Sequence, residues 1–180
     1  MGHKKIIFFD GDGTLWFPKK TKHTIKPHWV YKDSSIKNPL EHLVLVPGAL
    51  KTLQELQKRK ILCVVLSTHP TSLANAQKVL EKKVSYFKLQ KYFIEIYATE
   101  EYLESKGEHI SSILSKYKMP KASALMVGDN YSWDYKPAKK VGVEAVLIES
   151  DYMKKDKRLT TVRNIENILD FCNPRASNSE

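Results

Sequence analysis

Short apolar runs alternate with segments of helical period along this chain of 180 residues. The apolar runs predict strands at Lys5–Phe9, Ile61–Leu66, Phe93–Tyr97, Ala122–Val127 and Glu144–Ile148. Apolar residues at helical spacing predict helices from Pro47 on, around Leu73–Leu80, at Ile110–Tyr117, near Ser132–Val141 and over Val162–Cys172. Strands that alternate with helices and lack a polar face indicate a parallel sheet in a three-layer α/β fold.

One segment, Trp16–Val46, does not follow this alternation. It has no clear period, it contains three prolines, and it is rich in lysine. Loops of about 30 residues are uncommon inside a compact domain and are often functional. We therefore expect a single domain over 1–172 with a lysine-rich loop insertion near 17–46, followed by a flexible polar tail at 173–180.

Polar residues follow three of the predicted strands. Asp10 and Asp12 come directly after the first strand, Ser67 follows the second, and Asp129 with Asp134 follows the strand at Ala122–Val127. In a parallel sheet, ligands bind beyond the carboxyl ends of the strands, so these groups are expected at one edge. Taken alone, the pair Asp10 and Asp12 is also compatible with part of a calcium loop or with a capped turn.

The charge and composition narrow the function only a little. A formal net charge of +10 is compatible with anionic substrates, nucleic acid or a membrane surface, although lysines spread along the whole chain favour a solvated surface. Cys63 and Cys172 are too few for a disulfide framework or a zinc site. With no apolar run of about 20 residues and few apolar residues before Asp10, we expect a cytoplasmic protein with no membrane partner.

Four motifs, in order, resemble those of the haloacid dehalogenase (HAD) superfamily of phosphotransferases. They are FFDGDGTLW, VVLST, the step Lys106-Gly107, and VGDNYSWD. The resemblance covers roughly residues 4–150, and its first and last motifs are the specific ones.

Within that superfamily, the chain is most similar to the magnesium-dependent phosphatase-1 or acid phosphatase-like subfamily. The likeness rests on the ending Thr14-Leu15-Trp16 and on the segments TSLANAQKVLE and FKLQKYFIEIY. The run Gly11-Asp12-Gly13 departs from the subfamily, which more often has a bulkier residue beside the second aspartate.

The resemblance implies a Rossmann-like, HAD-like parallel sheet and hydrolysis of phosphomonoesters through an aspartyl-phosphate. Neither interval that houses a cap domain in relatives is long enough for a full one, so the protein is expected to have no cap or a minimal cap. Asp10 would be the nucleophile, and Asp12 would protonate the leaving oxygen and later accept a proton from water. An aspartate at this second position favours hydrolysis.

The resemblance also implies a cofactor and phosphate ligands. Mg²⁺ would be bound by the Asp10 carboxylate, the Asp12 backbone carbonyl and Asp129, with Asp134 acting directly or through the groups that hold the ion. Lys106 would neutralise the phosphate, with Lys116 or Lys118 as less well placed stand-ins. The phosphate would also be bound by Ser67, with Thr68 as the fallback.

Several alternatives for substrate and role stay open. The expected substrate is a phosphorylated small molecule or a phosphoprotein, and phosphate removal from nucleic-acid ends is the weaker alternative. An open site would admit bulky substrates unless the lysine-rich loop or an oligomer partner covers it. The protein is expected to be a monomer or a small homo-oligomer. The remaining rival, a non-catalytic binding module, gives no reason to keep Asp10 and Asp12 together.

Overall fold

A six-stranded parallel sheet forms the centre of the protein. The computed structural model describes residues 3–69, 72–100, 106–153 and 156–172. The sheet order is β5-β4-β1-β6-β7-β8. Its strands are β1 (Ile6–Phe9), β4 (Leu62–His69), β5 (Glu95–Glu100), β6 (Ala124–Gly128), β7 (Glu144–Ile148) and β8 (Thr161–Val162). The expected α/β fold with a parallel sheet is confirmed.

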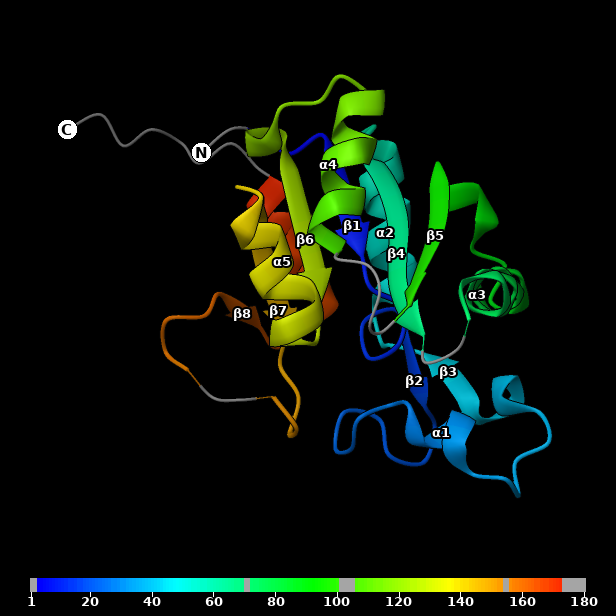
Figure 1. The fold of residues 1–180 in the computed structure, drawn as a ribbon. Coiled ribbons are helices and arrows are strands. Elements are labelled where there is room, and N and C mark those ends of the chain that lie inside the picture. The colour runs from blue at the N-terminus through cyan, green and yellow to red at the C-terminus, as the bar shows by residue number, and fades with distance from the viewer. Residues whose placement is uncertain (1–2, 70–71, 101–105, 154–155, 173–180) are drawn as a thin grey trace.

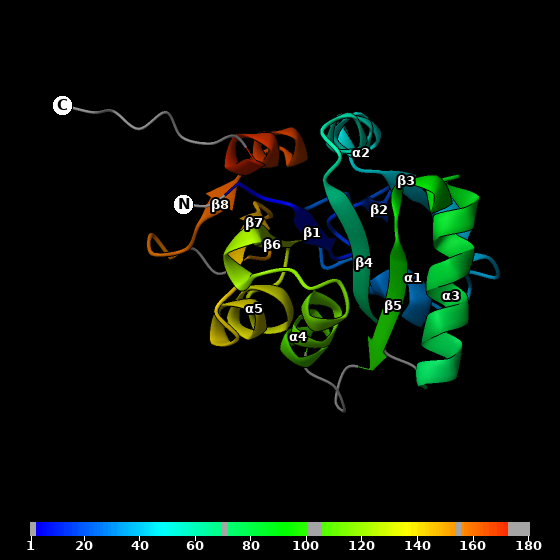
Figure 2. The same cartoon turned by 90° about the horizontal axis from the view of Figure 1, so that it is seen from above.

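Helices cover both faces of this sheet. The α-helices are α2 (Ala49–Lys58), α3 (Leu73–Tyr86), α4 (Lys106–Lys116) and α5 (Lys136–Lys140). Single turns and 3-10 segments complete the chain at Pro39–His42, Gln90–Tyr92, Lys121–Ser123 and Ile165–Cys172, with a π-helical turn at Tyr131–Tyr135. Figure 2 shows α4 and α5 on one face, α2 and the last 3-10 helix on the other, and α3 beside β5.

Alternate residues of β1 enter two separate cores. Ile7 and Phe9 pack in the core beneath α2, α3 and the last helix, whereas Ile6 and Phe8 pack in the core beneath α4 and α5. All four side chains are fully buried. Since side chains of a strand alternate between faces, a continuous apolar run is what a strand covered on both sides requires.

The segment without clear period folds into a small lobe rather than a plain loop. Its strands β2 (Trp16–Pro18) and β3 (Leu43–Leu45) pair antiparallel and enclose the short helix α1 (Trp29–Lys32). Figure 1 shows this lobe beyond the ends of β1 and β4. The lobe is a small cap region, in agreement with the minimal cap that we expect. Strands this short give no readable alternation, so their pairing was not predictable from the pattern.

Several predicted boundaries were wrong. The strand expected at Ile61–Leu66 begins at Leu62 and continues to His69. The strand expected at Phe93–Tyr97 begins at Glu95 and continues to Glu100. Val162 lies in β8, where it pairs with Ile148, so the last helix begins only at Ile165. The expected tail at 173–180 lies outside the described residues. None of the helices in the described part of the chain combines the length and apolar composition needed to cross a bilayer.

Candidate active site

Asp10 lies where β1 ends, and a tight turn follows it. The Asp10 amide donates to the Val127 carbonyl at 2.9 Å, which extends the β1–β6 pairing to the site. Gly13 has φ +86°, and a Cβ there would lie 2.1 Å from Asp129 Oδ2. Glycine is therefore required at this position both by the backbone and by the close approach of Asp129.

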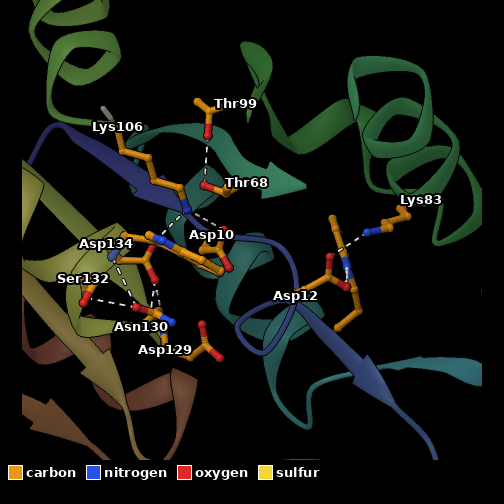
Figure 3. Close-up of polar contacts among 12 residues, drawn as sticks. Asp10, Asp12, Thr68, Lys83, Thr99, Lys106, Asp129, Asn130, Ser132 and Asp134 are labelled. Carbon is orange, nitrogen blue, oxygen red and sulfur yellow. Dashed lines mark hydrogen bonds and ion pairs between the residues drawn. The ribbon is translucent and has the colours of Figure 1, made fainter. Parts of the chain in front are cut away.

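Lys106, the first residue of α4, bridges two carboxylates. Its Nζ lies 2.6 Å from Asp10 Oδ1 and 2.6 Å from Asp134 Oδ1 (Figure 3). Burial alone would lower the pKa of Lys106, but the charges of Asp10 and Asp134 outweigh it and raise that pKa. The ammonium is therefore fully charged at the centre of the site.

Asp10, Asp129 and Asp134 form a buried carboxylate cluster. One oxygen of each lies within 4.8 Å of the others. The second oxygen of Asp134 accepts from the backbone amides of Asp129 and Asn130, at 3.2 and 2.9 Å. The Tyr152 hydroxyl donates to Asp129 Oδ2.

The electrostatics of this cluster fit a bound cation. Burial and the charges of Asp10 and Asp134 raise the pKa of Asp129, and burial together with Asp10 raises that of Asp134 against the opposing effect of Lys106. Among the described residues, Lys106 forms ion pairs with two of these three carboxylates, Asp10 and Asp134. A divalent cation among these oxygens would supply the missing positive charge, and carboxylate oxygens are the ligands that Mg²⁺ prefers.

Ser67 and Thr68 lie at the end of β4, on either side of the pleat. A Cβ on Gly11 would lie 2.9 Å from Ser67 Oγ, so this hydroxyl packs against the turn after Asp10. Thr68 lines the pocket beside Asp10 and shares a hydrogen bond of 2.9 Å with the Thr99 hydroxyl. Both residues are buried.

Asp12 has partners of its own, and the sequence did not predict them. Its Oδ1 accepts from Trp16 Nε1 at 3.0 Å and from the Tyr31 hydroxyl at 2.6 Å, and its Oδ2 lies 2.6 Å from Lys83 Nζ. Burial alone would raise the pKa of Asp12, but the charges of Lys83 and His28 and the hydrogen bonds from Lys83 and Tyr31 hold it below its ordinary value. Figure 3 shows Asp12 and Lys83 on the side of the site away from Lys106 and Asp134.

The pocket over Asp10 is small and is lined partly by the lobe. It encloses about 320 Å³ of space, including its open mouth. Lys26, Pro27 and His28 of the lobe line it together with Trp133 and Tyr152. The rings of His28 and Trp133 stack with centroids 5.6 Å apart. The lysine-rich segment therefore reaches the site.

The tyrosines and Lys83 gave little signal in the sequence. Lys83 follows Leu80 by three positions, so it continues the apolar stripe of its helix, and a lysine in a buried stripe indicates a buried counter-charge. Tyr31 lies in a segment without period, and Tyr152 follows the last predicted strand by only four residues. Neither tyrosine belongs to a sequence motif.

The fold and the site together define a Rossmann-like α/β enzyme whose polar groups gather beyond the ends of parallel strands. The chain belongs to the haloacid dehalogenase-like hydrolases, because the model of that family matches residues 16–148. The predicted membership in the HAD superfamily is thereby confirmed, and the protein is a HAD-type hydrolase. The family match does not single out the magnesium-dependent phosphatase-1 subfamily.

Known proteins similar to this chain agree with that family. A ribulose-1,5-bisphosphate 5-phosphatase from Halopiger xanaduensis is 28% identical over 137 residues, which are 73% of this chain and 55% of that protein. The chain thus spans about half the length of this curated relative. A haloacid dehalogenase-like hydrolase from Streptococcus pneumoniae matches with TM-score 0.70 and 15% identity over 94% of this chain and 99% of that one. A HAD-superfamily hydrolase from Ehrlichia chaffeensis matches with TM-score 0.68 and 16% identity, over 96% and 97%.

Proposed function

We propose that this protein is a magnesium-dependent phosphomonoester phosphatase that acts through an aspartyl-phosphate on Asp10. The observation that carries the proposal is the contact of Asp10 with the Lys106 ammonium, together with its place in the buried carboxylate cluster with Asp129 and Asp134. Phosphoryl transfer requires a nucleophile in line with the leaving group and positive charge around the phosphate oxygens. The proposed site offers both.

The reaction has two steps. An Asp10 oxygen attacks phosphorus, the bond to the leaving oxygen breaks, and that oxygen takes a proton from Asp12. Water then attacks phosphorus, Asp12 accepts the proton of the water, and the bond between phosphorus and Asp10 breaks. Separate partners for the two aspartates support this division, since Asp10 contacts Lys106 and Asp12 contacts Lys83.

The magnesium ligands in this proposal are the carboxylates of Asp10 and Asp129, the Asp12 backbone carbonyl, and Asp134. When bound, Mg²⁺ neutralises the phosphate oxygens and stabilises the charge that develops in the transition state. Asp134 accepts two backbone amides and the Lys106 ammonium, which orients it toward the cluster. Lys106 keeps Asp10 and Asp134 together despite their like charges.

Phosphate binding is assigned to Lys106, Ser67 and Thr68. Thr68 lines the pocket, and its hydroxyl already has Thr99 as a partner, which would orient it. The hydroxyl of Ser67 packs against the turn after Asp10. The likeness to the magnesium-dependent phosphatase-1 subfamily belongs to this proposal as well, and it is supported by the bond from Trp16 of the Thr-Leu-Trp ending to Asp12.

The substrate in this proposal is a phosphorylated small molecule. The lobe residues Lys26, Pro27 and His28, which line the pocket, support a compact substrate over a phosphoprotein or a nucleic-acid end. The name of the Halopiger relative refers to a sugar bisphosphate, so a sugar phosphate is the class of substrate to test first.

Hydrolysis of p-nitrophenyl phosphate with and without magnesium tests the proposal. We expect turnover that depends on the metal and that the substitution Asp10→Asn abolishes while the circular dichroism spectrum is unchanged. Undiminished turnover in Asp10→Asn would refute the mechanism. A panel of phosphorylated metabolites then identifies the substrate class.

The nucleic-acid alternative is favoured only by the net charge of +10. It predicts binding to a 5′-phosphorylated oligonucleotide that weakens steeply with salt, together with loss of the terminal phosphate. Absence of binding at about 50 mM salt, where such contacts are strong, would leave the small-molecule substrate.

A further inference from the structure

Lys83 is a fully buried lysine with a specific acceptor. It lies on α3 in the apolar stripe of that helix, with 1% of its surface exposed. Within the described residues its Nζ donates to Asp12 Oδ2 at 2.6 Å, and it lies 4.3 Å from the centre of the Tyr31 ring. Burying an ammonium is costly by several kcal/mol unless a partner compensates it. A residue that served only packing would not be a lysine.

Three donors converge on the Asp12 carboxylate and occupy both of its oxygens. They come from three parts of the fold: Trp16 from the start of β2, Tyr31 from α1 of the lobe, and Lys83 from α3. Because α1 and α3 are independent elements, their side chains restrict the carboxylate from two directions. These contacts fix the orientation of the Asp12 carboxylate, which the turn that carries Asp12 would not fix alone.

We propose that Lys83, together with Tyr31, is a positioning residue for Asp12 and thereby controls hydrolysis of the aspartyl-phosphate. The inference rests on the proposed function and goes beyond it, since it adds two residues that carry no family motif. Lys83 keeps Asp12 oriented so that an oxygen, exchanged from one of its donors, can accept the proton of the attacking water. Phosphate binding is assigned to other residues, so Lys83 acts on turnover and leaves substrate affinity nearly unchanged.

The choice of p-nitrophenyl phosphate separates the two halves of the reaction. The p-nitrophenolate leaves without needing a proton, so formation of the aspartyl-phosphate depends little on Asp12. Hydrolysis of the aspartyl-phosphate still requires Asp12. A defect confined to Asp12 therefore gives a rapid burst of p-nitrophenol followed by slow turnover, whereas general loss of structure lowers the burst itself.

The experiment compares the wild type with Lys83→Met, Asp12→Asn and the double variant, with Lys82→Met as the control. Lys82 is the exposed neighbour of Lys83 on α3 and should behave as the wild type. We expect Lys83→Met to lower kcat about ten-fold or more and to show the burst. Because only the second step is slowed, KM should fall together with kcat, and kcat/KM should stay within about two-fold. In the Asp12→Asn background, Lys83→Met should change kcat no further.

Equal loss of kcat in both backgrounds, or loss of the burst, would overturn the inference. If Lys83→Met does not fold, Tyr31→Phe replaces it, because this variant removes one hydroxyl and keeps the ring. Tyr31→Phe should show the burst in the wild-type background and should lower kcat no further in the Asp12→Asn background. Wild-type kinetics in Tyr31→Phe would then overturn the inference. Activity in the wild type with none of these effects refutes this inference alone, whereas an inactive wild type refutes the proposed function.

Discussion

The carboxylates of the site differ in their partners, although Asp10 and Asp134 share Lys106. Asp10 contacts the Lys106 ammonium, Asp12 contacts Lys83, and Asp129 accepts from the Tyr152 hydroxyl. These surroundings shift the pKa values in opposite directions, since that of Asp12 is lowered and that of Asp129 is raised. The lowered pKa keeps Asp12 ionised, which is the form that accepts the proton of water in the second step.

Removing the charge of Lys106 should impair catalysis strongly. Lys106→Met would leave Asp10 and Asp134 without their shared ammonium, so we expect kcat/KM for p-nitrophenyl phosphate to fall by about 100-fold or more. Lys116→Met is the matched control, because Lys116 is at the far end of the same helix and exposed. Comparable activity in Lys106→Met and Lys116→Met would contradict the role of Lys106.

His69 should make the fold sensitive to acid. Within the part of the chain that the structure describes, its ring nitrogens have no hydrogen-bond partner, and burial, aided by the charge of Lys83, lowers its pKa from 6.5 to about 4. Between these values the unfolded chain binds a proton that the folded protein does not, so the free energy of unfolding falls as the pH falls through this window. Urea titrations at about pH 7 and pH 5 should show a smaller loss in His69→Gln than in the wild type. Equal losses would contradict the assignment.

Residues at strand ends were predictable, and their partners on helices were not. Asp10, Asp129 and Asp134 follow apolar runs, and strand polarity alone places them at one edge. Lys83 lies on a helix whose rotation about its axis is set by packing, so its contact with a residue 71 positions away is a tertiary property. In the sequence, this contact was indicated only by a charged residue within the apolar stripe of the helix.

Among the elements, the lobe is the one that the sequence described least well. Five of the six parallel strands have apolar runs and were found, whereas the two-residue strand β8 was not. Strands β2 and β3 are three residues each and pair only through tertiary contacts. The prolines and the missing period correctly indicated an irregular segment. The sequence did not show that the lobe lines the pocket, because the path of an irregular segment follows no local rule.

Loosening the lobe should widen substrate choice. Trp133→Ala removes the ring on which His28 stacks, and such a contact contributes about 1 kcal/mol. We expect kcat/KM for a 5′-phosphorylated oligonucleotide to rise relative to that for p-nitrophenyl phosphate, by about five-fold. Tyr86→Ala is the control, because this exposed residue lies on α3 and is not among the residues that line the pocket. An unchanged ratio would mean that the lobe does not restrict access.

The whole molecule combines a basic surface with an acidic centre. The net charge is +10, yet the buried cluster at the strand ends holds three carboxylates around Lys106. The positive surface would attract phosphorylated substrates, and the acidic centre would bind the cation. The composition predicted the positive charge, whereas the acidic centre could be predicted only from the order of the strands in the sheet.

Magnesium should stabilise the protein in a pH-dependent way. Because the pKa values of Asp129 and Asp134 are raised, protons compete with the cation at low pH. We expect magnesium to raise the melting temperature more at about pH 8 than at about pH 5. The substitution Asp129→Asn should abolish the difference. An equal rise at both pH values would contradict binding at this cluster.

Trapping of the phosphorylated enzyme tests the central claim most directly. Borohydride reduces an aspartyl-phosphate to homoserine, so the residue that carried the phosphate can be identified by peptide mass spectrometry. With p-nitrophenyl phosphate and magnesium, we predict homoserine at position 10, in larger amount in Asp12→Asn, where hydrolysis of the intermediate is slowed. Homoserine at another position, or none in an enzyme that turns over, would contradict the account.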